Sequence, residues 1–161
     1  MIVCNTSPII NLAAIGELEI LKKLYGKIVI PGAVYDEITV KGRGQPGDEE
    51  VRTSGWIEVI NIKDRNLLTA LAVDLHPGEA EAIILAMEQN SDLLIIDENR
   101  ARRISSKFGI RFMGLLGVLL RAKRKGYIPA VKPLMDDLAI RAGFWIDREL
   151  YQTILKTAGE R

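Results

Sequence analysis

Four acidic residues stand out because they follow a predicted strand or lie on a predicted helix beside one. Asp97 follows the apolar run 93–96, and Glu37 lies in a predicted helix after an earlier apolar run. Glu79 and Glu81 lie near the start of the helix that precedes Asp97. Carboxylates without cysteine or histidine partners suit hard divalent cations such as Mg²⁺ and Mn²⁺. Cations held in this way activate water and stabilise an in-line phosphoryl displacement.

Each of these acids also has a purely structural interpretation. Asp97 would suit the cap of the following helix, a role compatible with metal ligation, and Glu37 would suit a solvated helix surface. Glu79 is the third helical residue if Pro77 is the first, where a glutamate often completes a capping box. Glu81 lies roughly 200° further around that helix, so the two glutamates do not easily share one site. Of the two, we favour Glu81 as the ligand.

The polar triplet Asn5, Thr6 and Ser7 separates the apolar run 1–4 from a helix. The run has no alternation, which is typical of a strand buried on both faces. Ser7 followed by Pro8 favours a helix start at this point. Because ligands bind at the carboxyl ends of the strands in open α/β sheets, we expect the triplet to point into a site.

The predicted helix 98–108 is basic and carries Arg100, Arg102 and Arg103. Such residues most often form a solvated helix face. The alternative is that they hold a phosphate backbone beside the acidic residues. His76 is the only histidine and precedes Pro77, so we interpret it as a turn residue rather than a ligand.

Predicted strands alternate with predicted helices along most of the chain. The strands are expected at 1–4, 27–30, 56–60, 93–97 and 110–113. The helices are expected at about 8–14, 18–24, 33–40, 48–53, 64–75, 77–89, 98–108, 115–125, 133–142 and 147–156. This alternation predicts an α/β fold, a three-layer α/β/α sandwich around a central parallel sheet of about five strands.

The chain has 161 residues, 48% hydrophobic and 27% charged, and is expected to form one domain over 1–161. We expect a core over about 1–125 and C-terminal helices over 129–158, which either close the core or form a dimer interface. The net charge of +1 gives no global preference for nucleic acid or membranes. No apolar run approaches the roughly 18 residues of a membrane span, and no leader-like segment opens the sequence, so we expect a cytoplasmic protein.

Four motifs in this order resemble the PIN-domain family, in particular the branch that opens with Asn-Thr-Ser-Pro. They are VCNTSP at 3–8, VYDEI at 34–38, GEAEAI at 78–83, and LIID at 94–97 followed by Ala101 and Arg102. The resemblance spans about residues 1–125. It implies a five-stranded parallel sheet and a carboxylate pocket for Mg²⁺ or Mn²⁺. It also implies metal-dependent RNA cleavage by the toxin of a toxin–antitoxin pair, a homodimer silenced by a small antitoxin protein.

Carried over by position, the resemblance places Glu37, Glu81 and Asp97 on three acidic positions of the family. The first acidic position is Asn5 here, whose neutral carbonyl oxygen is a weaker ligand than a carboxylate. Glu79 is expected to compensate if the helix geometry allows it.

Two functions follow from this resemblance. In the first, Glu37, Glu81 and Asp97 are catalytic and hold the metal with Asn5 as a weak fourth ligand. Thr6 and Ser7 then orient water or phosphate, and Arg100, Arg102 and Arg103 position the RNA backbone. In the second, the chain is a catalytically silent PIN-like module that binds RNA or a protein partner.

Overall fold

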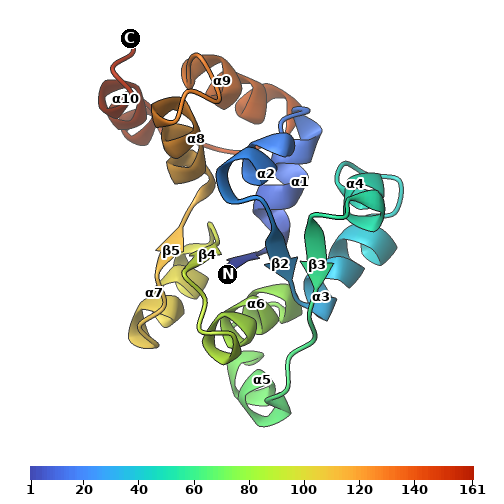
Figure 1. Ribbon diagram of the computed structural model, residues 1–161. Helices are drawn as coiled ribbons and strands as arrows, with labels where there is room; N and C mark the ends of the chain where they lie inside the picture. The colour runs from blue at the N-terminus through green and yellow to red at the C-terminus, as the bar shows by residue number, and fades with distance from the viewer.

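The computed structural model describes residues 1–161 and centres on a five-stranded parallel sheet in the order β3-β2-β1-β4-β5 (Figure 1). The strands are β1 (Ile2–Cys4), β2 (Ile28–Ile30), β3 (Ile57–Val59), β4 (Leu93–Ile95) and β5 (Phe112–Met113). In β1, Val3 is paired with Val29 of β2 on one side and with Leu94 of β4 on the other. The predicted α/β fold is therefore confirmed, and the opening apolar run is its central strand.

Helices cover both faces of this sheet (Figure 1). They are α1 (Thr6–Ala14), α2 (Glu19–Tyr25), α3 (Gly32–Asp36), the π-helix η1 (Glu37–Lys41), α4 (Asp48–Thr53), α5 (Arg65–Leu71), α6 (Pro77–Glu88), α7 (Asn99–Lys107), α8 (Leu115–Arg124), α9 (Lys132–Arg141) and α10 (Arg148–Thr157). Helix α1 begins at Thr6, two residues before Pro8, the expected first helical residue. The helix expected at 33–40 consists of α3 followed directly by η1.

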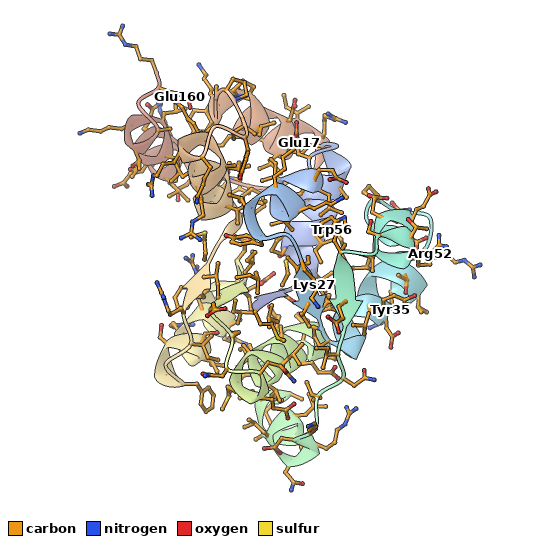
Figure 2. All side chains as sticks on the ribbon, viewed as in Figure 1. Glu17, Lys27, Tyr35, Arg52, Trp56 and Glu160 are labelled. Atoms are coloured by element: carbon orange, nitrogen blue, oxygen red, sulfur yellow. The ribbon has the colours of Figure 1, made fainter.

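The alternation of side chains along the strands builds two separate hydrophobic cores. Cys4 and Ile95 face a larger core shared with α1, α2 and α8, whereas Val3 and Leu94 face a smaller core formed mainly with α6. The side chains in Figure 2 fill the space on both sides of the sheet. Because all of the central strands are buried on both faces, their sequences read as continuous apolar runs.

The C-terminal helices add to the larger core. Met135, Leu138, Ile154 and Leu155 are buried in it, whereas Trp145, in the connection between α9 and α10, is 81% exposed. None of the helices is both long and apolar enough to cross a membrane.

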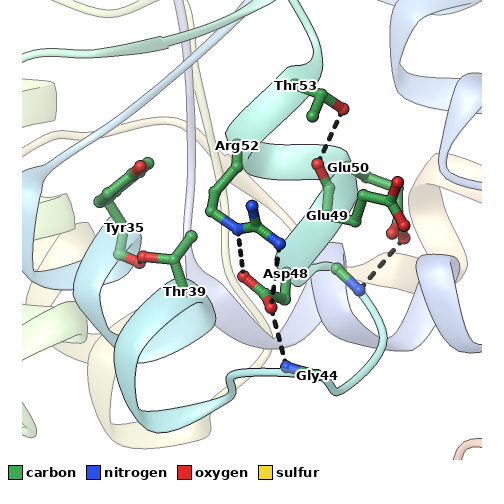
Figure 3. A network of polar contacts seen from close by, with 9 residues as sticks. Tyr35, Thr39, Gly44, Asp48, Glu49, Glu50, Arg52 and Thr53 are labelled. Carbon is green, nitrogen blue, oxygen red and sulfur yellow. Dashed lines mark hydrogen bonds and ion pairs between the residues drawn. The ribbon is translucent and has the colours of Figure 1, made fainter.

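The glycine-rich segment between η1 and α4 is held by Asp48 (Figure 3). The buried Asp48 carboxylate accepts hydrogen bonds from Arg52 Nε and from the backbone N–H of Gly44, both at 2.8 Å. The Arg52 hydrogen bond, with the Gly44 hydrogen bond second, lowers the pKa of Asp48. These hydrogen bonds fix the conformation of the segment that follows η1, the helical segment that begins at Glu37.

Candidate functional site

A hollow of about 380 Å³ opens at the carboxyl ends of β1 and β4, which we call the acidic hollow. Its lining consists of Asn5, Thr6, Ser7, Ile10, Asn11, Glu37, Lys41, His76, Pro77, Glu79 and Glu98. The position matches the rule that ligand sites in parallel sheets lie beyond the carboxyl ends of the strands. Three carboxylates and the whole polar triplet after β1 therefore face one space.

Glu37 is held at the wall of the acidic hollow by two donors. Its Oε2 accepts a hydrogen bond from Thr6 Oγ1 at 2.5 Å, and its Oε1 accepts one from the backbone N–H of Gly78 at 3.0 Å. Gly78 lies in the first turn of α6, where a negative charge is stabilised by the helix dipole. A β-carbon at position 78 would lie only 2.5–2.8 Å from the Glu37 carboxylate, so this contact requires glycine.

Glu98 is a residue of the site that the sequence analysis missed. Its Oε2 accepts a hydrogen bond from Asn5 Nδ2 and its Oε1 accepts one from Ser7 Oγ, both at 3.2 Å. Asn5 is 2% exposed, and its Oδ1 is buried without a hydrogen-bond partner. The carboxylate beside Asn5 is therefore that of Glu98, which follows the neighbouring strand β4.

Asp97 lies beside the acidic hollow but does not line it. Its Oδ1 accepts a hydrogen bond from the backbone N–H of Leu115 at 2.8 Å, so it caps α8 rather than α7, which directly follows it. Its Oδ2 is buried and has no partner. Burial, supported by the charge of Glu98 and opposed by Leu115 and Arg102, raises the pKa of Asp97 to about 6.

Glu79 has the capping role expected of it, but it, rather than Glu81, also faces the other acids. Glu79 lines the acidic hollow, and its Oε1 also accepts a hydrogen bond from the backbone N–H of His76 at 3.0 Å, which completes a capping box. Burial raises the pKa of Glu79, although the His76 hydrogen bond opposes this. In this structure Glu79, and not the favoured Glu81, lines the acidic hollow.

Glu81 points to the other side of α6, as its angular separation from Glu79 requires. Its Oε1 accepts a hydrogen bond from the backbone N–H of Ala33 at 3.1 Å, and its Oε2 lies 3.6 Å from Arg65 Nη1. Glu81 thus ties α6 to the start of α3, the element that leads into Glu37. It is a positioning residue in this structure and does not join the other acids.

The three arginines of α7 do not line the acidic hollow. Arg100 Nη1 donates a hydrogen bond to the backbone carbonyl of Asp74 at 3.1 Å. Arg102 and Arg103 line a second hollow together with Asn99 and Phe112. Of the predicted substrate-binding residues, only Thr6 and Ser7 therefore share the acidic hollow with the carboxylates.

The donor set of the site fits a hard divalent cation in kind, because every candidate ligand atom is an oxygen. Two of these oxygens, Asn5 Oδ1 and Asp97 Oδ2, are buried and without partners, which is the condition that a bound cation would relieve. As they are placed, no three of the acidic, histidine or cysteine side chains form a group that could hold a metal ion. Ligation would therefore require the glutamates to turn from their present donors toward these two oxygens.

Comparison with protein families identifies the family of the chain. A comparison with curated proteins found no match. A family model described as PIN domain matches residues 1–160, which is nearly the whole chain and includes the C-terminal helices. The parallel five-stranded sheet and the acidic hollow at its carboxyl edge agree with this match. The chain belongs to the PIN-domain family.

Proposed function

We propose that this protein is a metal-dependent ribonuclease, the toxin of a toxin–antitoxin pair, which acts as a homodimer and is silenced by a small antitoxin protein. One observation carries the nuclease assignment. The carboxylates of Glu37, Glu79 and Glu98 share a hollow at the edge of the sheet, and two unpartnered buried oxygens lie at the ends of the adjacent strands. Membership of the PIN-domain family supports the same function.

Glu37, Glu79 and Glu98 would hold Mg²⁺ or Mn²⁺ together with Asn5 Oδ1 and Asp97 Oδ2. Such an ion lowers the pKa of water and neutralises charge on the phosphate during an in-line displacement. The Thr6 and Ser7 hydroxyls, which now donate to Glu37 and Glu98, would orient the attacking water or a phosphate oxygen. Lys41 lines the same hollow and supplies a positive charge for the phosphate.

A second function is favoured by the present hydrogen bonding of the acids. The carboxylates of Glu37, Glu79 and Glu98 are each held by donors of the chain itself, and no three acids are gathered as a metal group. Asn5 also brings one negative charge fewer than an aspartate would. These features suit a catalytically silent module that binds RNA or a protein partner.

Calorimetric titration with Mn²⁺ separates the two functions. We expect the wild type to bind Mn²⁺, Asp97→Asn and Glu98→Gln to weaken binding at least about tenfold, and Asn5→Asp to strengthen it. Glu58→Gln, on the edge strand β3 and paired with Lys27 rather than with the site, is the matched control and should bind as the wild type does. RNA cleavage is then measured with Mn²⁺ for the same variants.

Two results would exclude the nuclease. One is the absence of Mn²⁺ binding at millimolar concentration in both the wild type and Asn5→Asp. The other is binding that neither Asp97→Asn nor Glu98→Gln weakens. Either outcome would favour the silent module.

A further inference from the structure

The second hollow combines two arginines, which attract anions, with a flat aromatic ring. It is lined by Asn99, Arg102, Arg103 and Phe112, and we call it the arginine hollow. The Arg102 guanidinium carbon lies over the Phe112 ring, 4.9 Å from its centre, so the two groups form a cation–π contact. Neither arginine forms an ion pair with an acidic side chain, and Arg102 Nε has no hydrogen-bond partner. Two positive charges thus share one hollow without an ion pair, although the charge of Arg102 acts on the neighbouring Asp97 carboxyl.

The arginine hollow adjoins the acidic hollow. Glu98 lines the acidic hollow and Asn99, the next residue and the first of α7, lines the arginine hollow. Asp97, beside the acidic hollow, and Arg102, in the arginine hollow, are both close to Gly114, where a β-carbon would lie 2.8 Å from Asp97 Oδ1 and 3.9 Å from the Arg102 guanidinium. A chain of phosphates that enters one hollow therefore reaches the other within a short distance.

We infer that the arginine hollow binds a nucleotide of single-stranded RNA that neighbours the phosphodiester held in the acidic hollow. This inference rests on the proposed ribonuclease function. Arg102 and Arg103 receive the phosphate through charge-assisted hydrogen bonds, and Asn99 supplies a further polar contact. The Arg102–Phe112 pair receives the base, because every base has a π-face that stacks on aromatic rings and guanidinium planes.

The strand must be single, because a paired base cannot leave its own stack to lie on the Arg102–Phe112 pair. The neighbouring Arg100 is not part of this subsite, since it donates to the Asp74 carbonyl. The net charge of the chain is +1, so general attraction for polyanions is weak and binding depends on the local pair of arginines.

The test is binding of a fluorescein-labelled single-stranded RNA of about ten nucleotides, followed by fluorescence anisotropy in EDTA. Without divalent metal, no cleavage occurs and the result does not depend on the proposed catalysis. We expect Arg103→Ala to weaken binding about fivefold to tenfold and to lower the slope of log K against log salt by about 0.7. Lys107→Ala removes an exposed charge from the last turn of the same helix and is expected to change affinity less than about twofold.

Phe112→Leu separates base stacking from phosphate binding. This variant keeps an apolar side chain and should weaken RNA binding by about fivefold or more, while competition by inorganic pyrophosphate stays at the wild-type level. Far-ultraviolet circular dichroism confirms that the variant is folded. A duplex of the same length should bind more weakly than the single strand.

Three results would overturn the subsite. The first is an unchanged RNA affinity in Arg103→Ala. The second is an equal loss of RNA affinity in Arg103→Ala and in Lys107→Ala. The third is competition for the RNA site by polyglutamate that is as strong as competition by inorganic pyrophosphate. Failure of the proposed ribonuclease function would give a different result. The RNA would then bind normally and its binding would depend on Arg103, but it would not be cleaved when Mn²⁺ is restored.

Discussion

At the scale of single residues, the absence of a side chain at position 78 allows Glu37 to reach the start of α6. Gly78→Ala is compatible with a helix and would by itself stabilise α6 by about 0.5–1 kcal/mol. The added methyl group would overlap the Glu37 carboxylate, so we expect a net loss of about 1–2 kcal/mol in the free energy of unfolding and weaker Mn²⁺ binding. Urea unfolding and calorimetry measure the two effects.

The control for this prediction is the same substitution in a Glu37→Ala background. There the overlapping carboxylate is gone, so Gly78→Ala should stabilise the protein by about 0.5–1 kcal/mol. A destabilisation of equal size in both backgrounds would mean that Gly78 is needed for a reason unrelated to Glu37.

Asp97 gives a pH-dependent prediction. Its pKa is about 6 in the folded protein and 3.8 as the ordinary value, so between these pH values the folded state binds more protons than the unfolded state. The stabilisation of the folded state by the protonated Asp97 is therefore complete below pH 4 and is lost as the pH rises through 6. In EDTA, we expect Asp97→Asn to be about 1–2 kcal/mol more stable than the wild type at pH 8 and nearly equal to it at pH 4.

Urea unfolding at the two pH values measures this difference. A variant that gains stability and loses Mn²⁺ affinity would show that the buried charge is retained for ligation. A loss of stability at pH 8 would instead show that Asp97 serves mainly as the cap of α8.

The sequence analysis predicted that the polar triplet after β1 points into a site at the carboxyl ends of the strands, and in the structure the triplet and Glu37 line the acidic hollow there. It did not predict the orientation of the acids. It missed Glu98, because Asp97 and Glu98 both follow the strand and only the backbone direction decides which one faces the hollow. The same limit affected Glu79 and Glu81, where the favoured residue points away.

At the scale of elements, every predicted strand and helix is present, because buried strands and amphipathic helices differ clearly in period. The π-helix η1 was not predicted, since its five residues carry no pattern that separates them from an α-helix. π-Helical segments are frequent at functional sites, and this one begins at Glu37. The paths of the C-terminal helices depend on long-range packing that no local pattern records.

The link between α6 and α3 tests the role of Glu81. We expect Glu81→Ala to destabilise the protein by about 1–3 kcal/mol, because the partly buried Ala33 N–H loses its acceptor. Glu81→Gln keeps that acceptor and loses only the pair with the exposed Arg65, so a change of less than about 1 kcal/mol is expected.

Thermal unfolding and Mn²⁺ calorimetry on both Glu81 variants distinguish a positioning role from ligation. Mn²⁺ affinity should stay within about threefold of the wild type in Glu81→Gln, in contrast to Glu98→Gln. A loss of metal binding in Glu81→Gln at unchanged stability would return Glu81 to the ligand set that the sequence analysis favoured.

At the scale of the whole molecule, the end of the chain holds the C-terminal helices together through Glu160, labelled in Figure 2. Its Oε2 accepts hydrogen bonds from Lys123 Nζ of α8 and from the backbone N–H of Val131, both at 2.8 Å. Its Oε1 accepts one from the backbone N–H of Lys132 at 3.0 Å, at the start of α9. One carboxylate thus joins the residue before the C-terminus to two helices of the larger core.

This arrangement predicts an acid-sensitive contribution of opposite sign to that of Asp97. Burial alone would raise the pKa of Glu160, but the hydrogen bonds from Lys123, Val131 and Lys132 lower it to about 2 from 4.5. The stabilisation is therefore complete above pH 4.5 and is lost as the pH falls toward 2. We expect Glu160→Gln to be less stable than the wild type at pH 7 and to approach it at pH 2.5, measured by urea unfolding at both pH values. Because Glu160 and the acidic hollow lie on separate elements, Mn²⁺ affinity should be unchanged in this variant, and a change in it would mean that the C-terminal helices control the geometry of the site.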